Sequence, residues 1–229
     1  MSPLQQLQWL QLCDSAFPIG AFSYSEGLEA AVHSGSVQHP EDLRRWMQEW
    51  IHQVFRTCDG PALVQVRAAW EQADLERLRQ LDHELTALRP AEASRVGSVV
   101  LGKRLLKAVL PLGIGAGLVR LEALLNSGEL SGNHLLVWAV VSSEAGWEPG
   151  GALNAYAYQR LNGMISAALR LFGIGQQAGQ QVLAQTLLRV PEAVAEVLQS
   201  PFEPLRAFSP WQDQAQMNHR FLYTRLFRS

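Results

Sequence analysis

Apolar residues recur at helical spacing along most of the chain. After Pro40, one side of a helix would carry Leu43, Trp46, Met47, Trp50, Ile51 and Val54. The segment 74–88 repeats this pattern with Leu75, Leu78, Leu81 and Leu85. No run of alternating β-branched residues between turn pairs predicts a sheet. The sequence therefore predicts an all-α fold.

Proline, glycine and capping residues divide this pattern into a single-domain bundle of about ten helices over residues 1–229. Among them we expect a helix over 23–33, a restart of helix at Asp59-Gly60-Pro61, a long helix over 152–172 and a last helix over 212–227. Short connections give no sign of a second domain. Three prolines within 200–210 predict a mobile tail over residues 200–229.

Charge and composition exclude several classes of protein. A net charge of −2 gives no electrostatic reason to expect nucleic acid. Cys13 and Cys58 lie too far apart for a CxxC pair, which argues against a zinc site and a disulfide framework. The first charge is Asp14, so there is no basic signal region, and the apolar stretch 108–119 is shorter than the roughly 18 residues needed to span a membrane. We expect a soluble, cytoplasmic protein that does not bind a membrane.

Two glycine-rich stretches resemble nucleotide-binding motifs only in part. The run Gly113-Ile-Gly115-Ala-Gly117 lacks the preceding strand, the third glycine and the following acid of a dinucleotide site. The stretch from Gly97 to Lys103 has phosphate-loop spacing, but Arg104 stands where a magnesium-binding Ser or Thr is needed. Both are expected to be helix-packing glycines, so any nucleotide would bind a partner.

Catalytic and metal motifs are equally incomplete. Ser23 or Ser25 could serve a small helical hydrolase, but no base lies nearby in sequence and no GxSxG elbow occurs. The histidines form no HxH or HExxH pattern, and a di-iron bundle would need more than the one Glu49–His52 pair. A helical DNA-binding regulator is the other alternative. We predict no catalytic residue, no metal ligand and no directly bound cofactor.

Three further surfaces can be interpreted from their residue types. Lys103, Arg104 and Lys107 would close a helix, where cations oppose the macrodipole. A polar row on the 152–172 helix is either a contact surface or a solvated face: Tyr158, Asn162, Ser166 and Arg170. Residues 221–229 interleave aromatics and leucines with two arginines, which favours docking into a partner groove, although they could fold back onto the core.

The longest motifs resemble one known family. Asp14-Ser-Ala-Phe-Pro-Ile-Gly-Ala-Phe-Ser-Tyr-Ser-Glu-Gly-Leu-Glu29 is similar to the amino-terminal signature of the urease accessory protein F (UreF) family. The 92–105 and 155–180 segments resemble its later helical motifs, and Met217-Asn-His-Arg-Phe-Leu-Tyr-Thr-Arg-Leu-Phe-Arg-Ser229 resembles its terminal motif. The sequence departs from the family pattern at 172–174, at Arg220 and at Thr224.

The resemblance implies an all-helical homodimer with no enzymatic activity of its own. Such a protein would be a scaffold that binds accessory protein D (also called H) and with it recruits the GTPase accessory protein G to apo-urease. Nickel and GTP would then be handled by the partner complex, and the outcome would be nickel insertion into urease.

The resemblance also suggests which residues contact partners. Ser166, Arg170 and Gln176 would face the GTPase, and Tyr223, Arg225, Leu226 and Phe227 would form a partner-dependent tail. The remaining predicted contact residues are Asp14, Pro18, Gly20, Phe22, Ser23, Glu29, Tyr156 and His219.

Overall fold

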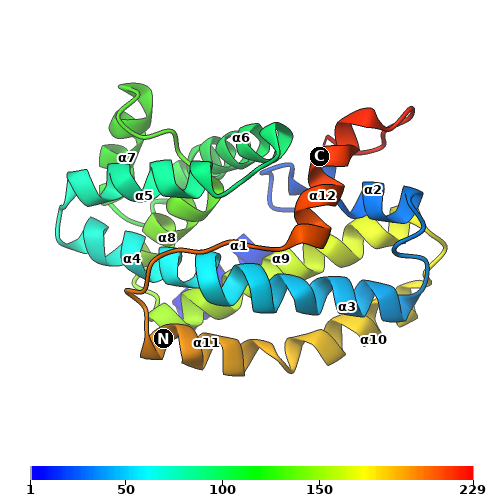
Figure 1. The fold of residues 1–229 in the computed structure, drawn as a ribbon. Coiled ribbons are helices and arrows are strands. Elements are labelled where there is room, and N and C mark those ends of the chain that lie inside the picture. Colours follow the sequence, from blue (N-terminus) through cyan, green and yellow to red (C-terminus); the bar gives the residue numbers. More distant parts are fainter. Residues whose placement is uncertain (1, 229) are drawn as a thin grey trace.

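The computed structural model describes residues 2–228, which form an all-helical fold without a strand in that range (Figure 1). The α-helices are α1 Pro3–Cys13, α2 Leu28–His33, α3 Pro40–Trp50, α4 Gly60–Glu71, α5 Leu75–Ala87, α6 Glu92–Val109, α7 Gly117–Asn126, α8 His134–Glu144, α9 Pro149–Leu171, α10 Gln176–Leu187, α11 Val190–Gln199 and α12 Pro210–Asn218. A π-helix, η2, covers Ile51–Asp59, and short 3₁₀ turns are η1 Ala21–Ser23, η3 Leu110–Leu112 and η4 His219–Phe221. The predicted all-α class is confirmed.

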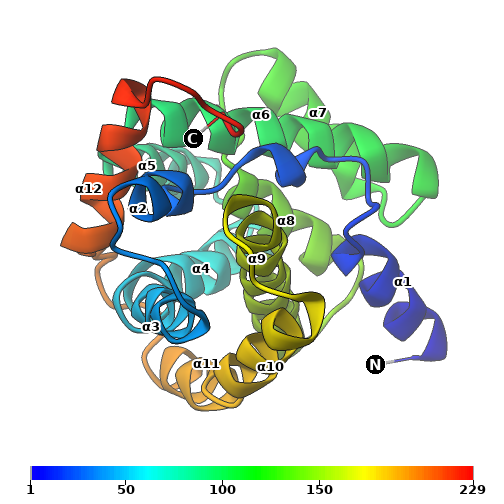
Figure 2. The same ribbon diagram turned by 90° about the vertical axis from the view of Figure 1, so that its right-hand side faces the viewer.

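Helices α8 and α9 lie at the centre of the bundle, and the other helices surround them (Figure 2). Every residue of α8 from His134 to Ser142 is buried, because α8 packs against both α4 and α6. The long helix α9 contacts α1, α2, α10 and α11, so it links opposite sides of the molecule. A helix that is apolar all round is expected to be buried, and α8 meets that description.

The predicted restart of helix at Asp59 is wrong. Helix α3 continues through η2 into α4 without a break, although Gly60 and Pro61 stand in its middle. A Cβ on Gly60 would lie 2.7 Å from Cγ2 of Val197 and 2.8 Å from the carbonyl oxygen of Phe55. The glycine therefore permits close packing, and the wide π turn absorbs the proline. Segments of π-helix are rare and are often found at functional positions.

The helix predicted to begin at Ser23 starts five residues later, at Leu28. Glu26 and Gly27 adopt the left-handed conformation with φ of 53° and 88°, which ends any helix before them. A Cβ on Gly27 would lie 2.9 Å from the backbone nitrogen of Gln216 in α12, so only glycine fits this contact. The turn before α2 is thus shaped by α12, which comes much later in the chain.

The predicted last helix over 212–227 is also only partly correct. Helix α12 ends at Asn218, η4 follows, and residues 222–228 are not helical. They run back along η1, where the amide of Arg228 donates to the carbonyl of Ser23 at 2.9 Å. The tail therefore packs against the core in part, and the aromatic residues do not share one helical face.

Candidate partner-binding site

Glu29 joins the amino-terminal signature to the tail. Its carboxylate is buried, lies 2.6 Å from Nε2 of His219, and accepts hydrogen bonds from the amides of Leu226 at 2.6 Å and Phe227 at 3.2 Å. The first turn of α2 places this acid beside α12 and η4. A buried carboxylate needs several donors, and here the tail backbone supplies two of them. The Glu29 side chain is therefore one attachment point that holds the tail in a defined position.

Arg170, in the last turn of α9, forms a second attachment point. Its Nη2 donates to the carbonyl of Phe22 at 2.5 Å, and its guanidinium carbon lies 4.2 Å from the ring centre of Phe227. The Phe227 ring is buried, so the arginine covers it and connects it to η1. The amino-terminal segment, the end of α9 and the tail thus meet at one place.

Large apolar side chains remain exposed around this meeting point. Phe22, Phe221 and Leu226 are 63%, 71% and 61% exposed, and Tyr223 is fully exposed. Exposed aromatic residues next to arginines are typical of the central part of protein interfaces. Because Phe227 points inward while its neighbours point outward, the tail is both anchored and available for contact.

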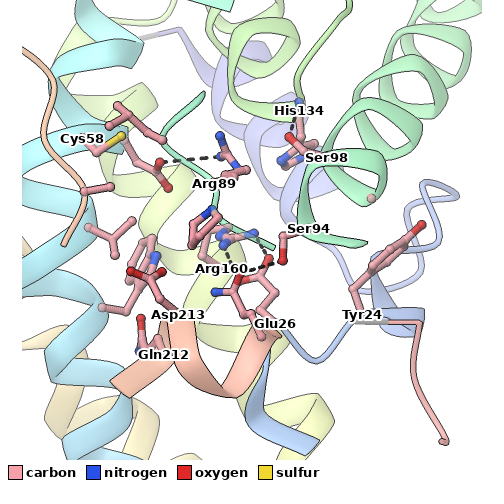
Figure 3. A pocket seen from close by; sticks show the side chains of 18 of the residues that line it. Tyr24, Glu26, Cys58, Arg89, Ser94, Ser98, His134, Arg160, Gln212 and Asp213 are labelled. Carbon is pink, nitrogen blue, oxygen red and sulfur yellow. Dashed lines mark hydrogen bonds and ion pairs between the residues drawn. The ribbon is translucent and has the colours of Figure 1, made fainter. Parts of the chain in front are cut away.

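A partly buried ion pair supports the turn before α2 (Figure 3). Both carboxylate oxygens of Glu26 accept from the guanidinium of Arg160 in α9. The same guanidinium lies over the rings of Trp50 and Tyr156, at 5.7 Å and 6.0 Å. This pairing compensates the left-handed conformation of Glu26 and so sets the direction in which α2 leaves the turn.

The ion pair lines a cavity of about 80 Å³ between α6, α8, α9, α12 and η2. On its wall the hydroxyl of Tyr156 donates to Asp59 at 2.9 Å, and Arg89 lies 3.8 Å from the same carboxylate. Burial, reinforced by the nearby charges of Arg160 and Arg89, lowers the pKa of His134 to about 3. The histidine is therefore neutral at physiological pH.

The structure brings together most of the predicted contact residues of the signature and the tail. Gly20, Phe22, Ser23, Arg170, Leu226 and Phe227 lie around η1, and Glu29 and His219 lie beneath it. Asp14 and Pro18 are exposed at the start of the same segment, and Arg225 is exposed in the tail. The backbone carbonyl of Ser166 accepts from Nε of Arg170 at 3.2 Å, whereas the side chains of Ser166 and Gln176 make no hydrogen bond to the described residues of this group.

Tyr156, predicted to contact a partner, points into the core of this structure. Its side chain is 1% exposed and its hydroxyl is bonded to Asp59. Glu29, His219 and Phe227 are likewise buried, so they position the tail and do not present atoms to a partner. The sequence reasoning also missed Arg160 and Asp59, which show no motif and become recognisable only when the helices are packed.

The glycine-rich loop 113–117 is not a phosphate site in this structure. The carboxylate of Glu144 accepts from the amide of Gly117 at 2.8 Å and from the indole of Trp70 at 2.8 Å. An anion-binding helix start must leave its amides free, whereas this one is occupied by the protein's own acid. Gly115 and Gly117 pack closely against Glu144, as expected, whereas a Cβ on Gly113 would contact nothing, and this residue instead ends η3 with a φ of 63°.

The hydrolase alternative also loses support. Ser25 is 2% exposed, and both members of the Glu29–His219 pair are 1% exposed, so substrate cannot reach them. Burial raises the pKa of both Cys13 and Cys58 to about 12, which leaves each thiol protonated and unreactive.

Within residues 2–228, no three His, Cys, Asp or Glu side chains gather as metal ligands. The same range contains no helix with the length and apolarity to traverse a bilayer.

Comparison with known proteins gives a consistent result. The sequence model of the UreF family matches residues 37–187. A urease accessory protein UreF from Dechloromonas aromatica strain RCB is 31% identical over 99% of this chain and 98% of its own length. One from Paenarthrobacter aurescens strain TC1 is 33% identical over the full length of both chains, and one from Bacillus sp. strain TB-90 is 30% identical over 97% and 98%.

The fold and the buried attachment of the tail, taken with these relatives, place the chain among helical accessory proteins that are not enzymes. More specifically, the chain belongs to the UreF family of urease accessory proteins.

Proposed function

We propose that this protein is a scaffold that binds accessory protein D and with it recruits the GTPase accessory protein G to apo-urease. In this assignment nickel is cargo, and both nickel and GTP are handled by the partner complex. The protein's own contribution is the shape of the surfaces that bring the partners together during nickel insertion in the cytoplasm.

One observation carries this proposal: the attachment of the tail to Glu29. The buried carboxylate fixes residues 226 and 227 while the side chains of Phe22, Phe221, Tyr223 and Leu226 stay exposed around it. Ordering a flexible segment costs free energy, so a tail that is already held in place binds a partner more tightly. We assign this surface to accessory protein D.

Two further surfaces support a scaffold with several partners. Arg170 and the half-buried Ser166 lie near the end of α9, and Gln176 is exposed at the start of α10, which suits the proposed contact with the GTPase. At the other side of the molecule, α1 exposes Leu4, Leu7 and Leu10 at 64%, 64% and 69%. Such a row on one helix suits self-association in the proposed homodimer.

Co-purification with tagged accessory proteins D and G tests the proposal. The full-length chain is compared with a chain truncated after Pro210 and with a shorter truncation after Leu222, which keeps α12. Arg225→Ala and Phe227→Ala provide single-residue versions of the same test, and far-ultraviolet circular dichroism checks that each variant keeps its helical content.

We expect the full-length chain to recover both partners and both truncations to lose D. Arg225→Ala should weaken recovery while the fold is retained, because its side chain has no partner within the described chain. If the folded full-length protein recovers neither D nor G, the scaffold function is wrong. If both point variants recover D as well as the wild type does, the tail is not the contact.

A further inference from the structure

Cations without a partner are concentrated on one face of the molecule. Most of the 19 Lys and Arg side chains are bound to acids, carbonyls or rings. Among residues 2–228, the side chains with none of these contacts are Lys103, Arg104, Lys107, Arg189, Arg206, Arg225 and Arg228. Five of these seven come from only two places, the second half of α6 and the tail.

Helix α6 and the tail lie against the same short turn, η1 (Figure 2). A Cβ on Gly20, just before η1, would lie 2.6 Å from Nη1 of Arg104. At the end of η1, the carbonyl of Ser23 accepts from the amide of Arg228 at 2.9 Å. Arg104 and the backbone of Arg228 thus lie at the two ends of η1, and we group the unpaired cations of these two segments as the basic face: Lys103, Arg104, Lys107, Arg225 and Arg228.

Two acids in the segment that follows η1 are already engaged. Both oxygens of Glu26 are bound to Arg160, and the carboxylate of Glu29 is bound to His219 and two tail amides. Neither acid can neutralise the exposed cations. The five cations of the face therefore keep no side-chain partner among the described residues, although the chain as a whole has a net charge of −2.

Exposed apolar groups lie on the same segments. Phe22, in η1, and Leu226, in the tail, are more than half exposed. A mixture of arginine, aromatic and aliphatic side chains is typical of protein interfaces, whereas a nucleic-acid site needs a predominantly basic surface on a basic domain. A protein partner with acidic residues around an apolar centre fits both properties.

We propose that the basic face docks an acidic, partly apolar surface of accessory protein D, with Lys103, Arg104 and Lys107 extending the tail site onto α6. This inference rests on the proposed function, since it names the chemistry of the surface that D would present. Complementary charges mainly accelerate association and make it sensitive to salt.

A pair of charge-reversal variants isolates this surface. Lys103→Glu/Lys107→Glu reverses the charge of two exposed residues of α6. Arg189→Glu/Arg206→Glu makes the same change in net charge at two exposed, unpaired residues elsewhere. Lys103→Gln/Lys107→Gln is a milder version that leaves no repulsive charge at the end of the helix. Binding to purified accessory protein D is measured by biolayer interferometry from about 0.05 M to about 0.5 M NaCl, a range over which screening changes strongly.

We expect the wild type to lose about tenfold in affinity across this range. The α6 glutamate variant should bind about tenfold more weakly at low salt and lose most of the salt dependence, whereas the Arg189/Arg206 variant should behave like the wild type. Salt-independent binding that both α6 variants share with the wild type would overturn the inference but leave the scaffold function standing. Absence of binding by the folded wild type would instead overturn the scaffold function.

The two lysines allow an independent readout, because Lys103 and Lys107 are the only lysines in the chain. Acetylation with an amine-reactive reagent, followed by mass spectrometry, should label both in the free protein and neither in the complex with D. Equal labelling in the complex would contradict the inference. Binding of anionic lipid vesicles or duplex DNA through the same lysines, with D binding unaffected, would reassign the face to those partners.

Discussion

The carboxylate of Glu29 in α2 lies 2.6 Å from Nε2 of His219, a residue 190 positions later in the chain. Both side chains are almost completely buried, and the same carboxylate also holds the amides of Leu226 and Phe227. The position of the tail, and with it the exposed apolar surface around η1, therefore depends on one acid in the amino-terminal signature.

Glu29→Ala should release the tail. The substitution removes the acceptor for three donors, and hydrogen bonds to a charged group contribute roughly 1.5–3 kcal/mol each, though not additively. We expect faster trypsin cleavage after Arg220 and Arg225 and weaker recovery of accessory protein D. Glu92→Ala, at an exposed residue on α6, is the matched control. Unchanged cleavage in Glu29→Ala would mean that other contacts hold the tail.

Arg160→Met should destabilise the fold and also loosen the tail. It leaves the Glu26 carboxylate without its partner in a partly buried position, where breaking such a pair costs about 3 kcal/mol. Adding Glu26→Gln should restore part of the loss, because the uncompensated charge is then removed. Urea unfolding measures the stabilities, and trypsin cleavage reports on the tail. If the effects of the two substitutions on the free energy of unfolding simply add, the ion pair is not the link between α9 and the turn.

Leu7→Arg should disrupt self-association. The leucines of α1 are exposed in one row, and a charge in the middle of an apolar interface is strongly unfavourable. Light scattering coupled to size-exclusion chromatography should give a dimer mass for the wild type and a monomer mass for the variant. Val119→Arg, which changes an equally exposed residue on α7, should remain dimeric. If Leu7→Arg is dimeric as well, the dimer contact does not involve this row of leucines.

Acid should destabilise the protein partly through His134. Its pKa is about 3 in the folded state, against an ordinary value of 6.5, because burial disfavours the cation. Below pH 6.5 the unfolded chain binds a proton at this residue that the folded chain does not, so stability falls by up to about 1.4 kcal/mol per pH unit until the pH approaches 3. His134→Gln removes this proton uptake. The free energy of unfolding, measured with urea between about pH 6 and about pH 4, should therefore fall less steeply with acid in the variant. An identical slope would exclude His134 as the cause.

Several features of the fold follow directly from the sequence. The apolar spacing after Pro40 and in α5 was sufficient to locate those helices, since both bury one face against the core. Proline and glycine were less reliable markers. Gly60-Pro61 predicted an interruption, yet packing against Val197 and the π turn keep the helix continuous. Ser23 predicted a helix start, but the contacts of Glu26 and Gly27 with distant residues prevent it.

The sequence predicted which segments form the candidate site, but not how their side chains are oriented in space. The long motifs indicated which stretches matter, and the tail, the signature and Arg170 do meet in space. Periodicity cannot show that Tyr156 points into the core or that Phe227 is covered while Tyr223 is exposed. These properties depend on contacts between residues far apart in the chain, such as Tyr156 with Asp59 and Phe227 with Arg170.

The wide sequence separation of Glu29 from residues 219–227 also affects how the protein is made. During synthesis the signature emerges early, but its buried acid has no donors until nearly 200 further residues have left the ribosome. A partner that recognises the surface around η1 would therefore bind only chains in which residues 219–227 have already folded against Glu29.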